Sequence, residues 1–189
     1  GSAGSYRDSN RTAPHNLFVH LDTLAPKVKK RTTPAVGLFA RTDNYTWSDI
    51  GALEPVAEDL VSRVTLRYSS VETLTWTWSK NDKLWLRAES GQPFVTPEGT
   101  RIGAENIVIL MVKTSASGYT DSAGNRVPRT TLTGSGTGYI LVAGARMAVT
   151  WSKSKLSSQI MLKDGGGNLV NLPVGRTWVE LIPKTGGKV

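Results

Sequence analysis

The chain contains no cysteine and only two histidines among its 189 residues. The absence of cysteine excludes disulfide bonds, thiol catalysis and cysteine-ligated zinc. The histidines, His15 and His20, do not have the spacing of about three or four residues that places two metal ligands on one helical face. We therefore expect no metal ion and no other cofactor. No apolar run approaches the roughly 18 residues that a membrane-spanning helix needs.

Catalytic motifs are also scarce. No nucleophile elbow of the Gly-x-Ser-x-Gly type precedes a predicted helix. The nearest likeness, the glycine-rich residues 134–138, lies between two predicted strands, so we expect a hairpin turn there. A Ser-His-Asp triad stays open, and five carboxylates between residues 43 and 59 could serve glycoside hydrolysis, but no pair stands out. The sequence favours a domain without catalysis, with an enzyme as the alternative.

Tryptophan, in contrast, is well represented, with six residues that lie mostly in short strand-like segments. Between residues 64 and 87 apolar and polar side chains alternate, which predicts three antiparallel strands, the last two joined by a tight turn. Trp76 and Trp78 share one face of this pattern, whereas Trp85 has the opposite parity to its leucine neighbours. We expect at least one of the three at the surface, and Trp85 with Arg87 is the aromatic candidate for a ligand contact.

The remaining patterns indicate a β-rich fold. Residues 106–112 form a continuous apolar run, which predicts a central strand covered on both faces. Six further strand-like segments follow, separated by turns that contain glycine or proline. Residues 17–30 carry apolar side chains at helical spacing, which predicts a short helix. The expected fold is mainly β: an antiparallel sandwich or barrel-like domain with a short N-terminal helix.

The formal net charge is +8, and it is unevenly distributed. Residues 111–189 carry ten basic and three acidic side chains. Such an excess can attract an anionic polymer, although a solvated basic surface is the simpler explanation. Basic residues also accompany tryptophans between residues 76 and 87, but half of these aromatics must face a core, so we do not expect nucleic-acid binding.

A polar cluster near the N-terminus is the other candidate ligand site. Arginine can bind a carboxylate or phosphate through two parallel hydrogen bonds, and histidine can act as an acid or base near neutral pH. The alternative is that these side chains only hold an irregular loop through bonds to the backbone. The cluster consists of Arg7, Asp8, Arg11, His15 and Asn16.

With these segments in place, the chain resembles the C-terminal part of the YerB-like bacterial lipoproteins, the DUF3048 family. The motifs that carry the resemblance are YRD (6–8), RTAPHNL (11–17), VTLRYS (64–69), LWLR (84–87), GQP (91–93), GAENIVI (103–109), GSG (134–136), VTWSK (149–153) and LPVGRTWVELIP (172–183).

The resemblance implies three parts in the chain. Residues 1–40 would be an N-terminal extension from the end of the preceding family domain, 41–183 the β-rich C-terminal domain, and 184–189 a tail. It also implies an extracytoplasmic parent protein, held to the membrane by an anchor outside this chain. The family brings no established activity and no accepted catalytic residues.

The sequence therefore leads to one main hypothesis and two alternatives. The main hypothesis is a non-catalytic module of an envelope lipoprotein, which binds an anionic wall polymer or an envelope protein through basic and aromatic residues. The first alternative is a cell-wall-acting hydrolase whose site includes the Arg7–Asn16 loop. The second is a purely structural domain that braces its neighbour.

Overall fold

The computed structural model describes residues 4–10, 17–24, 26, 37–40, 60–70, 72–121 and 124–189. By their contacts, the residues group into two units, which are described separately. The first unit combines Gly1–Val36 with Gly118–Val127, and the second combines Gly37–Ser117 with Pro128–Val189.

In the first unit a small two-stranded sheet replaces part of the expected helix. Strand β1 (Ser5–Arg7) pairs antiparallel with β2 (Leu17–Val19), and the ring centroids of Tyr6 and Phe18 lie 5.5 Å apart across the pair. The prediction of a helix over residues 17–30 is wrong for β2, because its backbone groups bond to β1. Among the described residues of this stretch, α-helix is confined to one turn, α1 (Leu21–Leu24).

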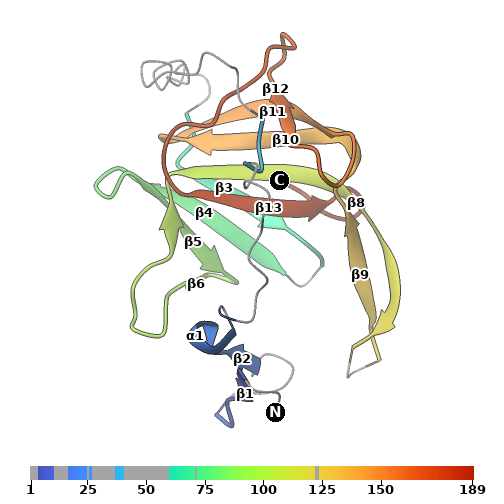
Figure 1. Cartoon of the computed structure of the whole chain (residues 1–189). Coiled ribbons are helices and arrows are strands. Elements are labelled where there is room, and N and C mark those ends of the chain that lie inside the picture. The colour runs from blue at the N-terminus through green and yellow to red at the C-terminus, as the bar shows by residue number, and fades with distance from the viewer. Residues whose placement is uncertain are drawn as a thin grey trace. The chain divides into compact units, whose positions relative to one another are not determined.

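The second unit contains two sheets (Figure 1). The five-stranded sheet contains the antiparallel meander of three strands that the alternating pattern predicts, and two short strands that were not predicted extend it. Its strands are β3 (Arg63–Arg67), β4 (Thr73–Ser79), β5 (Leu84–Glu89) and β6 (Gln92–Pro93), with β7 (Gly103–Ala104) also paired to β5.

The six-stranded sheet has the order β12-β11-β10-β8-β13, and β9 pairs with the long strand β8. All its pairs along this order are antiparallel except β8 with β13, which is parallel. The strands are β8 (Asn106–Thr120), β9 (Arg126–Thr131), β10 (Gly134–Val142), β11 (Ala145–Lys153), β12 (Met161–Lys163) and β13 (Thr177–Pro183).

The first part of strand β8, residues 106–112, is buried on both faces, as its apolar run predicts. Ile107 and Ile109 belong to a core cluster that also contains Trp76 and Trp85 of the five-stranded sheet. The intervening residues Val108, Leu110 and Val112 belong to a second cluster on the opposite face. The second cluster also holds apolar residues of β10, β11 and β12 together with Ile160 and Val170. The fold is therefore a β-sandwich, with no closed barrel among the described residues.

The tryptophans of the meander share a single face, which corrects the predicted parity of Trp85. Trp78 is the direct cross-strand partner of Trp85, and Trp76 lies two residues before Trp78 on the same face. Trp76 and Trp85 are fully buried, whereas Trp78 is half-buried. The apolar Leu84 and Leu86 misled the prediction because they point to the other face of β5 and are themselves half-buried.

The glycine-rich residues 134–138 also differ from expectation, since they open strand β10 instead of forming a turn. They serve close packing: a Cβ on Gly138 would overlap the carbonyl oxygen of Ile109, and one on Gly136 would lie 2.7 Å from the indole nitrogen of Trp151. The Trp151 N–H donates to the carbonyl of Met111 at 3.1 Å. These glycines thus let β8, β10 and Trp151 approach one another, which disposes of the elbow interpretation.

The C-terminal residues, expected as a tail, contact the five-stranded sheet. Arg67 and Lys188 exchange two backbone hydrogen bonds of 2.9 and 3.0 Å, and Val189 packs against the first core cluster. The domain boundaries at residues 40 and 183 stay predictions. No helix among the described residues has the length and apolar character to cross a membrane.

Candidate functional site

The N-terminal polar cluster is described only in part. Arg7 is the last residue of β1, and the carboxylate of Asp8 accepts a hydrogen bond from the backbone amide of Asn10 at 2.9 Å. A side chain-to-backbone bond of this kind agrees with the alternative that these polar residues only hold an irregular loop. Arg11, His15 and Asn16 lie outside the described residues, so the cluster as a ligand site remains a prediction.

Trp85 is not available as an exposed contact residue. Its side chain is fully buried in the first core cluster, and its indole N–H has no hydrogen-bond acceptor among the described residues. Its ring lies 5.5 Å from that of Trp78 at an angle of 51°. Trp85 therefore supports Trp78 from within the core.

Arg87 is also enclosed, with only 11% of its side chain exposed. Its guanidinium lies 4.2 Å from the ring centroid of Phe94 and 5.4 Å from that of Trp178. One of its nitrogens lies 3.0 Å from Glu89, and Nε lies 3.7 Å from Glu180. The structure thus places Arg87 inside a packed network and not on a surface that meets ligands.

The carboxylate of Glu180 is the centre of that network. Glu180 is 4% exposed and accepts hydrogen bonds from the Trp76 indole at 3.0 Å and from the Tyr68 hydroxyl. Burial, followed by the hydrogen bond and the negative charge of Glu180, raises the pKa of the Tyr68 hydroxyl. Because Glu180 accepts both of these hydrogen bonds inside the core and lies 3.7 Å from Arg87 Nε, we interpret the network as structural.

A groove beside Trp78 is a better candidate for ligand contact. It encloses about 630 Å³ and is continuous in its lining residues with a hollow of about 390 Å³, since both are lined by Trp78, Lys80 and Ala143. Other apolar residues line the larger hollow, namely Val142, Pro173 and Val174. We call the two hollows together the Trp78 groove.

Packing holds the aromatic wall of the Trp78 groove in place. The β10–β11 turn, Ala143-Gly144, passes so close to the indole that a Cβ on Gly144 would lie 2.8 Å from its Cδ1. On the other side of the groove, buried Asn106 donates a hydrogen bond of 2.9 Å to the carbonyl of Pro173. Trp78 therefore presents part of its ring at a site whose walls are held by packing and hydrogen bonds within the protein.

Two lysines give the Trp78 groove its charge. Lys80 and Lys83 lie in the β4–β5 turn, which is closed by a 2.6 Å hydrogen bond between Ser79 and Asp82. Neither ammonium has a carboxylate within ion-pair distance among the described residues. The groove thus combines a partly exposed aromatic ring with two cations, a combination that suits stacking and oxyanion contacts.

The only carboxylate among the residues that line the Trp78 groove is already engaged. Glu105 pairs with the Arg176 guanidinium at 3.3 Å and accepts a hydrogen bond from the Arg176 amide at 2.9 Å. Burial would raise the pKa of Glu105, but the hydrogen bonds and the positive charge of Arg176 outweigh it and lower the pKa.

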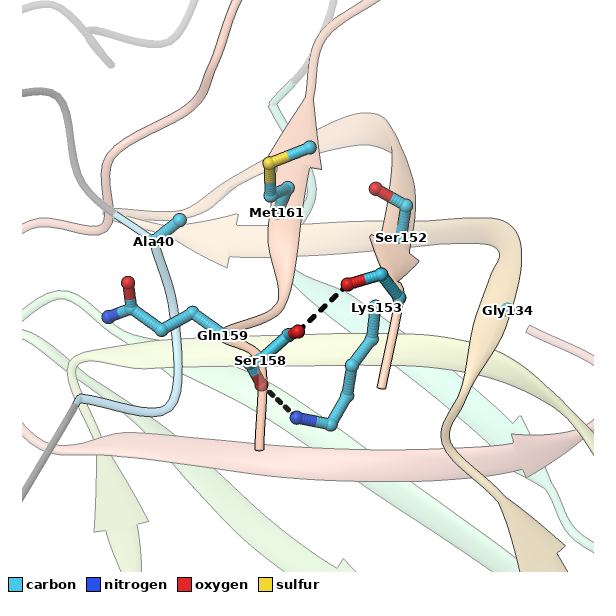
Figure 2. Close-up of a pocket in the computed structure, with 8 residues that line it drawn as sticks. Ala40, Gly134, Ser152, Lys153, Ser158, Gln159 and Met161 are labelled. Carbon is cyan, nitrogen blue, oxygen red and sulfur yellow. Dashed lines mark hydrogen bonds between the residues drawn. The ribbon is translucent and has the colours of Figure 1, made fainter. Parts of the chain in front are cut away.

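A second pocket, of about 440 Å³, lies beside the end of β11 (Figure 2). It shares no lining residue with the Trp78 groove. It contains Lys153, which is 8% exposed and donates a hydrogen bond to the carbonyl of Ser158. We call it the Lys153 pocket; its other lining residues are Ala40, Gly134, Ser152, Ser154, Ser158, Gln159 and Met161.

The sequence-based predictions identified neither the Trp78 groove nor the Lys153 pocket. The Trp78 groove needs the cross-strand register of β4 and β5, which the hydrophobic pattern alone does not supply. For Lys153 the one available signal was its position two residues after Trp151, which places a lysine on the buried face of a strand.

The chain is similar to known proteins both in sequence and in fold. A family model described as the C-terminal domain of "Protein of unknown function (DUF3048)" matches residues 64–179. The crystal structure of the YerB protein from Bacillus subtilis is similar with a TM-score of 0.70 and 17% sequence identity, which shows a shared fold. That similarity covers 100% of this chain but only 60% of the YerB chain. No curated protein matches. Because the family model covers more than half of the sequence, the chain belongs to the DUF3048 family and corresponds to the C-terminal region of a YerB-like protein.

Proposed function

We propose that this domain is a non-catalytic binding module that holds an anionic polymer of the cell envelope in the Trp78 groove. The observation that carries the proposal is a half-buried tryptophan beside two lysines, Lys80 and Lys83, that have no carboxylate partner among the described residues. The indole face would contact the sugar or polyol units, and the two ammoniums would contact the phosphates.

The basic surplus of residues 111–189 supports the same partner, because a positive net charge attracts a polyanion. The extracytoplasmic location, with a membrane anchor outside this chain, belongs to the same proposal and rests on the family resemblance. An envelope protein with an acidic surface is the other partner that such a groove suits.

Binding to a poly(glycerol phosphate) polymer tests the proposal. The variant Lys80→Gln with Lys83→Gln is expected to weaken binding about tenfold, since each exposed charge contributes up to about 1 kcal/mol. The affinity of the unchanged protein should also fall as salt rises, because exposed charges are screened. Dextran, a neutral polymer, should bind more weakly.

A matched control removes the same charge elsewhere. Lys163→Gln with Lys184→Gln alters two exposed lysines that do not line the groove, and it should leave most of the affinity intact. If the two double variants lost affinity equally, binding would depend on the net charge of the protein and not on the Trp78 groove. Absence of binding by the unchanged protein would refute the proposal.

A further inference from the structure

The Lys153 pocket shares no lining residue with the Trp78 groove. The side chain at its centre is a lysine that is almost completely buried. Lys153 follows Trp151 on the inward face of β11, and only 8% of its surface is exposed. Lysine is almost never buried to this degree unless it has a partner of opposite charge. Among the described residues, no carboxylate lies within ion-pair distance of its ammonium.

The ammonium has hydrogen-bonding capacity to spare. Figure 2 shows the Lys153 side chain reaching toward Ser158, where its Nζ donates to the backbone carbonyl. An ammonium carries three N–H donors, and this is the one bond that the described residues show for it. A buried donor without an acceptor costs free energy, which an incoming acceptor would recover.

The surrounding side chains suit an oxyanion. Ser152, Ser154 and Ser158 line the pocket, and the hydroxyls of Ser154 and Ser158 lie 2.8 Å apart. Hydroxyl groups can turn their hydrogens toward a negative oxygen. No acidic side chain is among the residues that line the pocket.

The remaining walls are set by Gln159 and Met161. The Gln159 amide donates to the carbonyls of Gly37 and Phe39, both at 3.0 Å, and so holds the segment that carries Ala40 against this edge. Met161 is 42% exposed and adds apolar surface beside Ala40 (Figure 2). The volume of about 440 Å³ falls within the usual range for small-molecule sites.

We propose that the Lys153 pocket binds a small organic group with a single negative charge, carried by a carboxylate or a phosphodiester. The anion lies against Lys153 Nζ and the hydroxyls of Ser154 and Ser158, and the organic portion lies against Met161 and Ala40. One cation without a second arginine or lysine in the lining matches one negative charge and leaves a dianion half-neutralised. This site is independent of polymer binding in the Trp78 groove.

Amide chemical shifts of the full chain, titrated with defined probes, test the proposal. The probes are N-acetylglycine, which carries a carboxylate, dimethyl phosphate, which carries a phosphodiester, and N-acetylglycinamide, which is the uncharged analogue. We expect saturable shifts at residues 152–161 with at least one monoanion, at a dissociation constant of about 10 mM or lower. The tighter monoanion identifies which of the two groups the pocket takes, and the amide should cause no saturable shift.

Two lysine variants separate ligand binding from a purely structural role of Lys153. Lys153→Met keeps the apolar stem and removes the charge, and it should weaken binding at least tenfold. Lys163→Met removes the same charge from an exposed position of β12 and should leave the affinity unchanged.

Because Lys153→Met also removes the bond to the Ser158 carbonyl, a second variant retains Lys153. Ser154→Ala with Ser158→Ala is expected to weaken binding about threefold or more. The proposal is overturned if neither monoanion gives saturable shifts, if the amide binds equally well, or if a folded Lys153→Met protein keeps the affinity.

Discussion

At the scale of single residues, Glu180 joins the two sheets of the sandwich through polar contacts. It lies on β13 of one sheet and binds Trp76 and Arg87, which lie on β4 and β5 of the other, as well as Tyr68 just beyond β3. A buried carboxylate with this many partners stabilises the structure only while the set is complete, because each removed partner leaves another group without one.

Replacement of Glu180 by glutamine is therefore expected to be costly. Glu180→Gln should lower the free energy of unfolding by about 3 kcal/mol, since Arg87 loses a buried countercharge. Urea unfolding measures the change. Glu105→Gln is the matched control, because its ion pair with Arg176 is largely exposed and should contribute less than about 1 kcal/mol. Equal effects of the two substitutions would contradict the structural role of Glu180.

Because of Tyr68, the free energy of unfolding is expected to decrease at alkaline pH. Its pKa is raised by burial first and by Glu180 second, so the folded protein keeps a proton that the unfolded chain releases near pH 10. The stabilisation is complete below about pH 10 and declines as pH rises toward the folded pKa. Between about pH 9 and 11 the unchanged protein should lose stability more steeply than Tyr68→Phe, as urea unfolding would reveal. Parallel curves would exclude this linkage.

Trp85 illustrates how far a local pattern predicts burial. Within β5 its apolar neighbours suggest one face, but the register with β4 places it opposite Trp78 and inside the core. Pairing between strands, and not the composition of one strand, decides which face is covered. Trp78, which is partly exposed, is therefore the candidate for ligand contact in place of the buried Trp85.

At the scale of elements, the turn between β10 and β11 supports the Trp78 groove. Ala143 and Gly144 both have positive φ, at 49° and 81°, a conformation that fits a two-residue hairpin but strains alanine. Gly144 also leaves room for the Trp78 ring. The turn and the indole are thus built against each other.

Substitutions in this turn should have unequal effects. Gly144→Ala adds a methyl group 2.8 Å from the indole and strains the backbone, so it should lower the free energy of unfolding by about 1–3 kcal/mol and alter tryptophan fluorescence. Ala143→Gly, its neighbour, relieves strain and should change stability by less than about 1 kcal/mol. Urea unfolding followed by fluorescence distinguishes them. A Gly144→Ala protein as stable as Ala143→Gly would show that the contact with Trp78 gives way freely.

Elements with local signals were predictable, and those with distant partners were not. The β4–β5 hairpin follows from alternation, and the doubly covered first part of β8 follows from an apolar run; both patterns lie within a few consecutive residues. Strand β2 looked helical because Leu17 continues the helical spacing of Leu21 and Leu24, whereas its pairing with β1 leaves no repeating pattern within three residues. The glycines of β10 looked like a turn because the groups they accommodate, on β8 and β11, lie far along the chain.

At the scale of the whole molecule, β8 contributes to both core clusters of the second unit. Side chains on its two faces cannot separate from each other, so loss of either cluster exposes the other. The candidate binding sites have the same non-local origin: the Trp78 groove takes its walls from β4, β10 and the segment before β13. No pattern in the sequence brings these segments together, which is why the groove could not be predicted.

The second unit should unfold as one cooperative body. Leu66→Ala in the first cluster and Leu162→Ala in the second should each cost about 2–5 kcal/mol. Each substitution should shift the urea midpoint equally whether tryptophan fluorescence or far-ultraviolet circular dichroism is followed. Separate transitions in either variant would show that β8 does not couple the clusters.

The parallel pairing of β13 with β8 has a consequence for biosynthesis. Strand β13 comes after all the other strands that the structure describes, yet it pairs with β8, which contributes to both core clusters, and it brings Glu180 to Tyr68, Trp76 and Arg87. During translation the earlier strands emerge first. Tyr68, Trp76 and Arg87 are therefore synthesised before Glu180, the carboxylate that they contact in the folded domain. A nascent chain halted before Thr177 therefore exposes one edge of β8 and an incomplete core, a state that proteases and chaperones recognise. The last strand thus makes stable folding conditional on synthesis having passed Glu180.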